Sequence, residues 1–210
     1  MNKNEKSIFS ALRSRGFTVQ GACAVLANMH AESACRPGNL QNSGNARLKM
    51  TDAEYTDAVD NGTYTKFATD SRGYGLCQWT YHTRKAALLK LAQSRGVSIA
   101  DIGTQVDFMI AEMSTSKLLP KIKNAADVAE ATRRMMLDYE RPANQTEANV
   151  ETRIRYARIY YAEFAQADLA ADLATLTGKG IITSPAYWEK TAPSVKYLPE
   201  LIHNIAEAIR

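Results

Sequence analysis

The chain has 210 residues and a formal net charge of +4, with 45% apolar and 23% charged residues. This composition is ordinary for a globular protein and excludes a disordered chain. The apolar runs are shorter than the roughly 20 residues that a membrane-spanning helix needs, and no dense Lys/Arg tract indicates nucleic acid. We therefore expect neither membrane insertion nor a nucleic-acid partner.

The N-terminal residues and the cysteines bear on where the protein is made. Residues 1–6 are polar, so we expect no signal peptide and synthesis in the cytoplasm. An extracellular target would then be reached through a holin, a virion or cell lysis. Cys23, Cys35 and Cys77 are odd in number and lack CxxC spacing, which predicts neither a disulfide framework nor a zinc site. We expect no metal and no cofactor.

Helical periodicity dominates the chain up to residue 169. Residues 34–73 differ, because Pro37-Gly38 and Asn61-Gly62 are turn signals and Thr63-Tyr64-Thr65 favours a short strand. The sequence therefore predicts a mainly α domain with a small turn- and β-rich insert. The expected helices are 5–15, 18–33, a short one at 51–59, 82–95, 101–113, 125–139 and 147–169.

A second unit is expected from residue 170 onward, which gives domains at 1–169 and 170–210. Gly178 and Gly180 stop a helix, and Ser184-Pro185 supplies an N-cap and a first-turn proline for the next one. About 40 residues are too few for a comfortable core of their own. This small helical module would brace the first domain, attach to a cell wall, or form a homodimer.

Glu32 is the first candidate for chemistry. The apolar face of the 18–33 helix runs through Ala22, Leu26 and Met29, and Glu32 continues it. Burial raises the pKa of a carboxylic acid, which can then donate a proton near neutral pH. A solvated or ion-paired Glu at a helix end is the alternative interpretation.

A second candidate is the glycine-bearing segment from Asp70 to Thr80. Its paired glycines allow close approach of backbone or ligand. Tyr74 and Trp79 offer flat faces of the kind that stack on sugar rings, and Gln78 carries both a donor and an acceptor. A structural turn around a buried Trp is the alternative.

These segments resemble a known family. Glu32-Ser33 looks like the Glu-Ser motif of soluble lytic transglycosylases and goose-type lysozymes, and Gly75-Leu76-Cys77-Gln78 resembles their Gly-Leu-Met-Gln motif. Gly73–Thr80 together with Asp138-Tyr139-Glu140-Arg141-Pro142 is similar to the phage tail lysozyme family, over roughly residues 5–165. Three short motifs in the same order are more specific than any one of them.

The resemblance implies a lysozyme-like fold and cleavage of the β-1,4 bond between N-acetylmuramic acid and N-acetylglucosamine in bacterial peptidoglycan. Glu32 would be the general acid. Gln78 would line the cleft, Tyr139 would close the site, and Ser33 would orient the acid or contact substrate, with Tyr74 and Trp79 as further substrate contacts.

Several residues are candidates for the second carboxylate of such a site. Asp70 lies just upstream of the Gln motif, where goose-type relatives recruit an aspartate, and we expect it to be the second catalytic carboxylate. Asp57 and Asp60 compete with it. Glu140, followed by Arg141, is expected to form an ion pair that anchors the last helices.

Three functions compete. The first is a muramidase that hydrolyses glycan strands. The second is a lytic transglycosylase, which needs one acid, activates no water and leaves 1,6-anhydro ends. The third is a catalytically inactive tail or wall-binding module that retains the fold.

Overall fold

The computed structural model describes residues 1–195 and 198–209, and every described element is a helix. Within these ranges no helix is both long and apolar enough to cross a membrane. The elements are α1 (Lys3–Arg13), α2 (Val19–Ser33), α3 (Asn42–Leu48), α4 (Asp52–Asp60), α5 (His82–Arg95), α6 (Ile102–Ser114), α7 (Leu118–Lys123), α8 (Val128–Arg134), the π-helix η1 (Met135–Glu140), α9 (Glu147–Gly178), α10 (Pro185–Thr191), the 3₁₀ turn η2 (Ala192–Ser194) and α11 (Leu198–Ile209).

Local side-chain chemistry sets where several helices begin. Asn2 and Glu5 form a capping box at the start of α1, and Thr51 and Glu54 form another at the start of α4. Thr18 accepts a hydrogen bond from the Gly21 amide and so caps α2. Each cap satisfies amide groups that have no partner within the helix.

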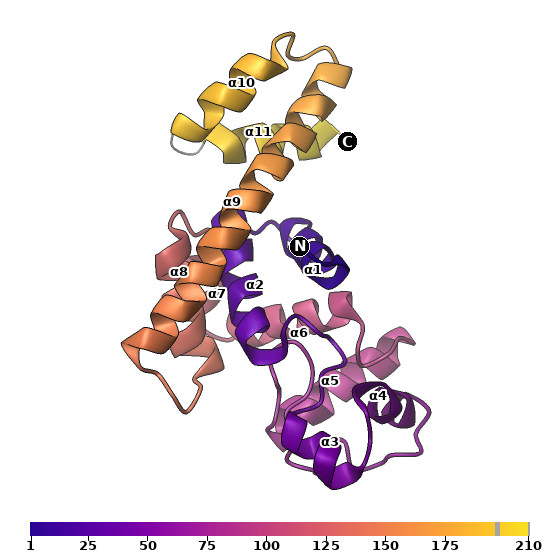
Figure 1. The fold of residues 1–210 in the computed structure, drawn as a ribbon. Coiled ribbons are helices and arrows are strands. Elements are labelled where there is room, and N and C mark those ends of the chain that lie inside the picture. The colour runs from indigo at the N-terminus through magenta and orange to yellow at the C-terminus, as the bar shows by residue number, and fades with distance from the viewer. Residues whose placement is uncertain (196–197, 210) are drawn as a thin grey trace.

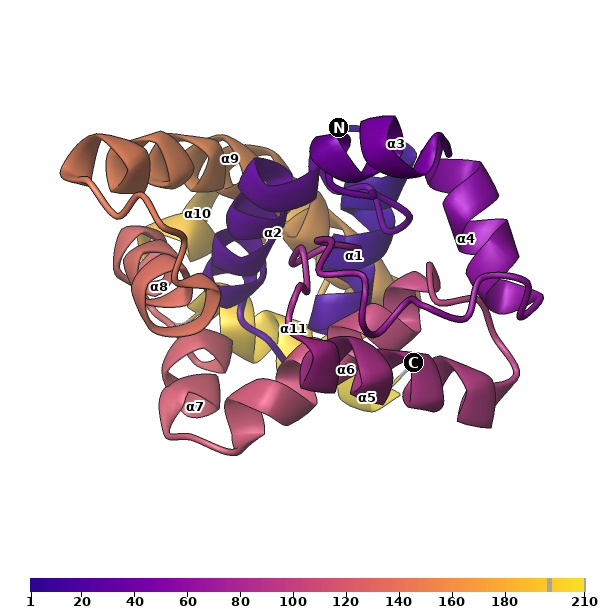
Figure 2. The same cartoon turned by 90° about the horizontal axis from the view of Figure 1, so that it is seen from below.

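Helix α2 is the centre of the main domain. It packs against α1, α7, α8, η1 and α9, and every residue from Gly21 to Met29 is buried. Figure 1 shows α9 beside α2 and α8, running on beyond the main body to α10 and α11. In Figure 2, α3 and α4 lie at the end of the molecule opposite α8. The helix that ends in Glu32 is therefore held on several sides before its last turn reaches the surface.

The expected β-rich insert is wrong. Residues 34–73 contain α3, α4 and turns, and within the described chain only two isolated bridges occur, Leu40 with Tyr74 and Tyr74 with Trp79. The expected strand around Tyr64 lies in a turn, where it has no neighbouring strand to pair with. An aromatic cluster of Tyr55, Phe67 and Tyr74 fills this region instead.

The predicted boundary near residue 170 falls inside α9, which continues to Gly178. The main core and a second apolar cluster share this helix. The second cluster consists of Leu169, Leu173, Leu176, Ala192, Ile202 and Ala206. Two groups of residues far apart in sequence thus pack on successive halves of α9.

Candidate active site

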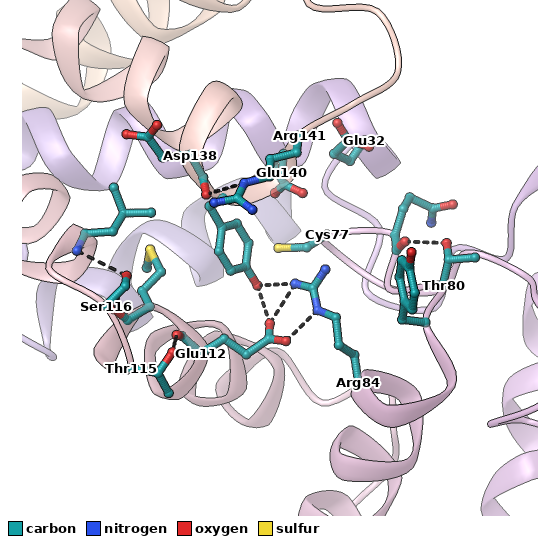
Figure 3. A pocket seen from close by; sticks show the side chains of 15 residues that line it. Glu32, Cys77, Thr80, Arg84, Glu112, Thr115, Ser116, Asp138, Glu140 and Arg141 are labelled. Carbon is teal, nitrogen blue, oxygen red and sulfur yellow. Dashed lines mark hydrogen bonds and ion pairs between the residues drawn. The ribbon is translucent and has the colours of Figure 1, made fainter.

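A cavity of about 640 Å³ opens where the end of α2 meets the loop before α5, the α6–α7 connection and η1 (Figure 3). Four segments that are distant in the sequence contribute to it. The lining residues are Glu32, Cys77, Gln78, Thr80, Tyr81, Arg84, Glu112, Met113, Thr115, Ser116, Leu118, Asp138, Tyr139, Glu140 and Arg141. The structure thus brings together three predicted site residues, Glu32, Gln78 and Tyr139.

Glu32 stands in the last turn of α2, next to the cavity. Ala34 adopts a left-handed conformation that ends the helix. Arg153 of α9 donates a hydrogen bond of 2.6 Å to Glu32 Oε1, and the Glu32 side chain remains 20% exposed. The same guanidinium donates to Asn28 Oδ1 at 2.9 Å, which fixes the orientation of Arg153. Glu32 is therefore held in place by α9 while it stays accessible from the cavity.

The Gly73–Thr80 segment is shaped by two close approaches. A Cβ atom on Gly73 would lie 2.7 Å from Gln78 Oε1, and one on Gly75 would lie 2.7 Å from Gln105 Oε1. Gln78 itself has a positive φ of 46°, and its amide donates to the carbonyls of Asn39 and Gly75. The glycines thus allow this turn to close, and the turn holds Gln78 against the cavity.

Three residues expected to contact substrate are buried instead. The ring of Tyr74 is fully buried, with its hydroxyl 2.7 Å from that of Thr56. Trp79 is also fully buried, and its indole donates to Glu112 Oε2 at 2.9 Å. The Ser33 hydroxyl bonds to backbone carbonyls of its own helix and of the Gly73–Thr80 segment. The expectation that these side chains touch sugar is wrong, because all three are buried in the protein interior.

Tyr81 is an aromatic residue at this cavity that the sequence analysis missed. It lines the cavity and is 75% exposed. An exposed ring at the edge of a cavity offers the flat apolar face that was expected of its buried neighbours. Its adjacency to the Gln motif is the only sequence signal that pointed to it.

Asp70 does not line the cavity. Its carboxylate accepts a hydrogen bond of 2.6 Å from the fully buried Lys85, a second from the Tyr55 hydroxyl, and a third of 3.0 Å from the Arg72 amide. The side chain of Asp70 is only 5% exposed. The expectation of a second catalytic carboxylate at Asp70 is therefore wrong, since this group neutralises a buried lysine. Asp57 and Asp60 do not line the cavity either.

Tyr139 belongs to a polar network with Arg84 and Glu112 at the cavity wall; Figure 3 labels Arg84 and Glu112. Its hydroxyl donates to Glu112 Oε2 at 2.6 Å and accepts from Arg84 at 3.0 Å. Arg84 also forms an ion pair with Glu112. Burial raises the pKa of Tyr139 well above its usual range. The network fixes the Tyr139 ring. The sequence spacing of Arg84 and Glu112 did not predict this network.

Glu140 is the last residue of η1 and also lines the cavity. Among the described residues no ion pair involves it, so the expected anchoring pair is wrong. Its Oε1 atom is buried without a hydrogen-bond partner. Burial has the largest effect on the pKa of Glu140, and the negative charge of Glu32 has the second largest. Together they raise this pKa to about 8. Glu32 and Glu140 are thus two of the four carboxyl-bearing residues that line the cavity, with Glu112 and Asp138, and their hydrogen-bond partners differ.

Two clusters bring three possible metal ligands within 4.8 Å of one another, and neither borders the cavity. In one of them Glu5 accepts a hydrogen bond from Tyr160, and in the other Asp168 pairs with Arg13. Protein donors thus satisfy these carboxylates. The clusters are Glu5, His30 and Cys35, and Asp168, Asp172 and His203.

The helical domain and its carboxyl-bearing cavity are those of a lysozyme-like protein. The family model of the phage tail lysozymes matches residues 3–164, and the chain belongs to that family. A curated relative, Morphogenesis protein 1 of Bacillus phage B103, is 26% identical over 165 residues, which are 74% of this chain. The chain spans only 38% of the length of that relative.

Proposed function

We propose that this chain is a muramidase that hydrolyses the β-1,4 bond between N-acetylmuramic acid and N-acetylglucosamine in bacterial peptidoglycan. The observation that carries the proposal is the convergence of Glu32, Gln78 and Tyr139 on one cavity. A phage tail lysozyme domain supports a peptidoglycan-lytic activity in general. The substrate, the bond and the residues are our inference.

In the proposed reaction Glu32 delivers a proton to the glycosidic oxygen as the bond from that oxygen to C1 breaks. Water then adds to C1 and gives up a proton to the site. Gln78 and the exposed Tyr81 ring line the cavity, and we expect them to bind the sugars that flank the broken bond. Proton donation of this kind is typically worth about 10² to 10⁴ in rate.

A lytic transglycosylase is a second candidate, and one observation favours it. Asp70, the expected water-activating carboxylate, is bound to Lys85 outside the cavity. In either case we propose that the protein acts at the bacterial cell wall, brought there by cell lysis or by a phage particle. The name of the phage B103 relative, a morphogenesis protein, supports the second route.

The mass spectrum of muropeptides released from purified walls tests the proposal. Hydrolysis gives reducing N-acetylmuramic acid ends, and transglycosylation gives 1,6-anhydro ends. Walls that lose no turbidity and release no fragments would show a catalytically inactive binding module instead.

Glu32→Gln is expected to abolish wall clearance, because the amide keeps the shape of the side chain but has no proton to transfer. We expect a loss of at least about 10²-fold in rate with an unchanged circular dichroism spectrum. Glu130→Gln on α8, an exposed residue that pairs with Arg134 and does not line the cavity, is the matched control. Clearance by Glu32→Gln within tenfold of wild type would remove Glu32 from the mechanism.

A further inference from the structure

Glu140 shares the cavity with Glu32, although the two residues are 108 positions apart in the chain. Glu32 ends α2 and Glu140 ends η1, and these two elements pack against each other. Figure 3 labels Glu32, Glu140 and Cys77 among the residues that line the cavity. The charge of Glu32 acts on Glu140, which places the groups within electrostatic reach.

The two carboxyl groups differ in their partners. Glu32 is bound by Arg153, whose guanidinium is directed to Glu32 and Asn28. Among the described residues, Glu140 Oε1 is buried and has no hydrogen-bond partner, and the same holds for the Nε of Arg153. An ionised carboxylate with a buried, unsatisfied oxygen is costly, whereas the neutral acid is much less so. The geometry therefore favours a proton on Glu140.

Charged and titratable groups from several elements act on Glu140. Burial has the largest effect on its pKa and the negative charge of Glu32 the next largest, and both raise it. A contact with the Cys77 thiol and the positive charges of Arg153 and Arg84 lower it in part. Tyr139, the preceding residue, is coupled to Glu140 as well. With a pKa near 8, the group binds a proton below that pH and loses it above.

We propose that Glu140 is the second catalytic carboxyl of this site, and that Glu32 and Glu140 together hold one transferable proton at neutral pH. In free protein the proton resides on Glu140, because Arg153 binds Glu32. In the reaction Glu140 passes this proton to Glu32, which gives it to the glycosidic oxygen as the C1–O bond breaks, and a proton from the attacking water restores it.

The reaction part of this proposal rests on the proposed function, but the shared proton does not. Carboxyl ¹³C NMR of the full-length protein, labelled at the Glu Cδ atoms, measures the proton directly. We expect one Glu resonance with a midpoint near pH 8. Glu140→Gln should remove it, Glu32→Gln should lower its midpoint by removing the neighbouring charge, and the exposed Glu130→Gln control should leave it unchanged.

Activity on purified walls supplies the second readout. Glu140→Gln should lower kcat by about 10-fold to 10²-fold and abolish the fall of activity near pH 8, with little change in KM. The amide replaces a neutral acid, so the fold should tolerate it. If the Glu140→Gln variant does not fold, the titration of the wild-type protein and its shift in Glu32→Gln still test the proposal.

Two results would overturn the proposal. One is a wild-type spectrum in which every Glu titrates below about pH 6, and the other is a Glu140→Gln enzyme with wild-type kcat and pH profile. A protein that shows the raised titration but releases no muropeptides would refute the proposed function and leave the shared proton standing.

Discussion

Lys85 of α5 forms an ion pair with Asp70, near the end of the 34–73 segment of the main domain. The Lys85 side chain has no exposed surface, and its ammonium donates to Asp70 at 2.6 Å and to the Arg72 carbonyl at 2.8 Å. It also lies 4.4 Å from the centre of the Phe67 ring. Burial lowers the pKa of Lys85 in spite of the neighbouring carboxylate. The pair therefore fixes the fold of a segment that has no strands to hold it.

Asp70→Asn should lower stability without a matching loss of turnover. The substitution leaves a buried ammonium without its counter-charge, and removing one partner of a buried pair costs about 3–5 kcal/mol. We expect this loss in urea unfolding, while the folded fraction keeps its rate on wall fragments.

The matched control is Asp70→Asn combined with Lys85→Met, which removes both charges and should recover much of the stability. If Asp70→Asn kept wild-type stability but lost activity by tenfold or more, Asp70 would have to be counted among the catalytic residues.

At the scale of elements, the departure of η1 from α-helical geometry brings three consecutive residues to the cavity, Asp138, Tyr139 and Glu140. The helix widens from Met135 to Glu140, directly after α8. Wider turns of this kind accommodate an extra residue and occur often at functional sites. Met135 and Met136 stay in the core, whereas Tyr139 and Glu140 both line the cavity. The register of η1 therefore decides which side chains meet Glu32.

Deletion of Leu137 should restore α-helical spacing and rotate Tyr139 and Glu140 away from their present positions. The change in direction is about 100° per residue in an α-helix of 3.6 residues per turn. We expect the helical circular dichroism signal to persist and wall clearance to fall by at least about tenfold, as it does when general acid catalysis is lost.

Deletion of Gln145, in the exposed loop that leads into α9, removes a residue without altering η1 and serves as the control. Wild-type clearance by the Leu137 deletion would show that the register of η1 is not required.

At the scale of the whole molecule, the cavity and the C-terminal module are separate features joined by α9. The cavity lining comes entirely from residues 32–141. The module packs on the far half of α9, where His203 bonds to Asp172 and lies 3.6 Å from Asp168, which in turn pairs with Arg13 of α1. The module is thus linked to the N-terminal helix but does not reach the proposed site.

Removal of residues 179–210 should lower stability more than turnover. The truncation exposes Leu169, Leu173 and Leu176 of α9, which are buried in the full chain. For a protein of this size each kcal/mol corresponds to about 2–4 °C in Tm, and we expect a fall of at least about 4 °C. Turnover of soluble glycan fragments should stay within about threefold of wild type, since the cavity is intact.

Leu201→Ser in the full-length chain is the control, because Leu201 is 55% exposed and surface changes cost little. Sedimentation velocity of both proteins also tests the expected homodimer through α10 and α11. Loss of fragment turnover by a folded truncated protein would mean that the module contributes to the site.

The sequence alone determined the features that depend on neighbouring residues. Caps and apolar periodicity predicted most helices of the main domain, because both act over one or two turns. Glu32 stood out because it continues the buried face of its own helix. Gln78 and Tyr139 lie in short motifs that resemble a known family, and the structure places both at the cavity.

Tertiary structure decided the features that depend on distant partners. Asp70 and Glu140 are both acidic residues near a motif, yet one meets the ammonium of Lys85 and the other meets Glu32 with no donor on its Oε1. Trp79 and Tyr81 are aromatic residues two positions apart, yet one is fully buried and the other 75% exposed. Burial and the charge of neighbours set what each side chain can do, and helices remote in the sequence supply both.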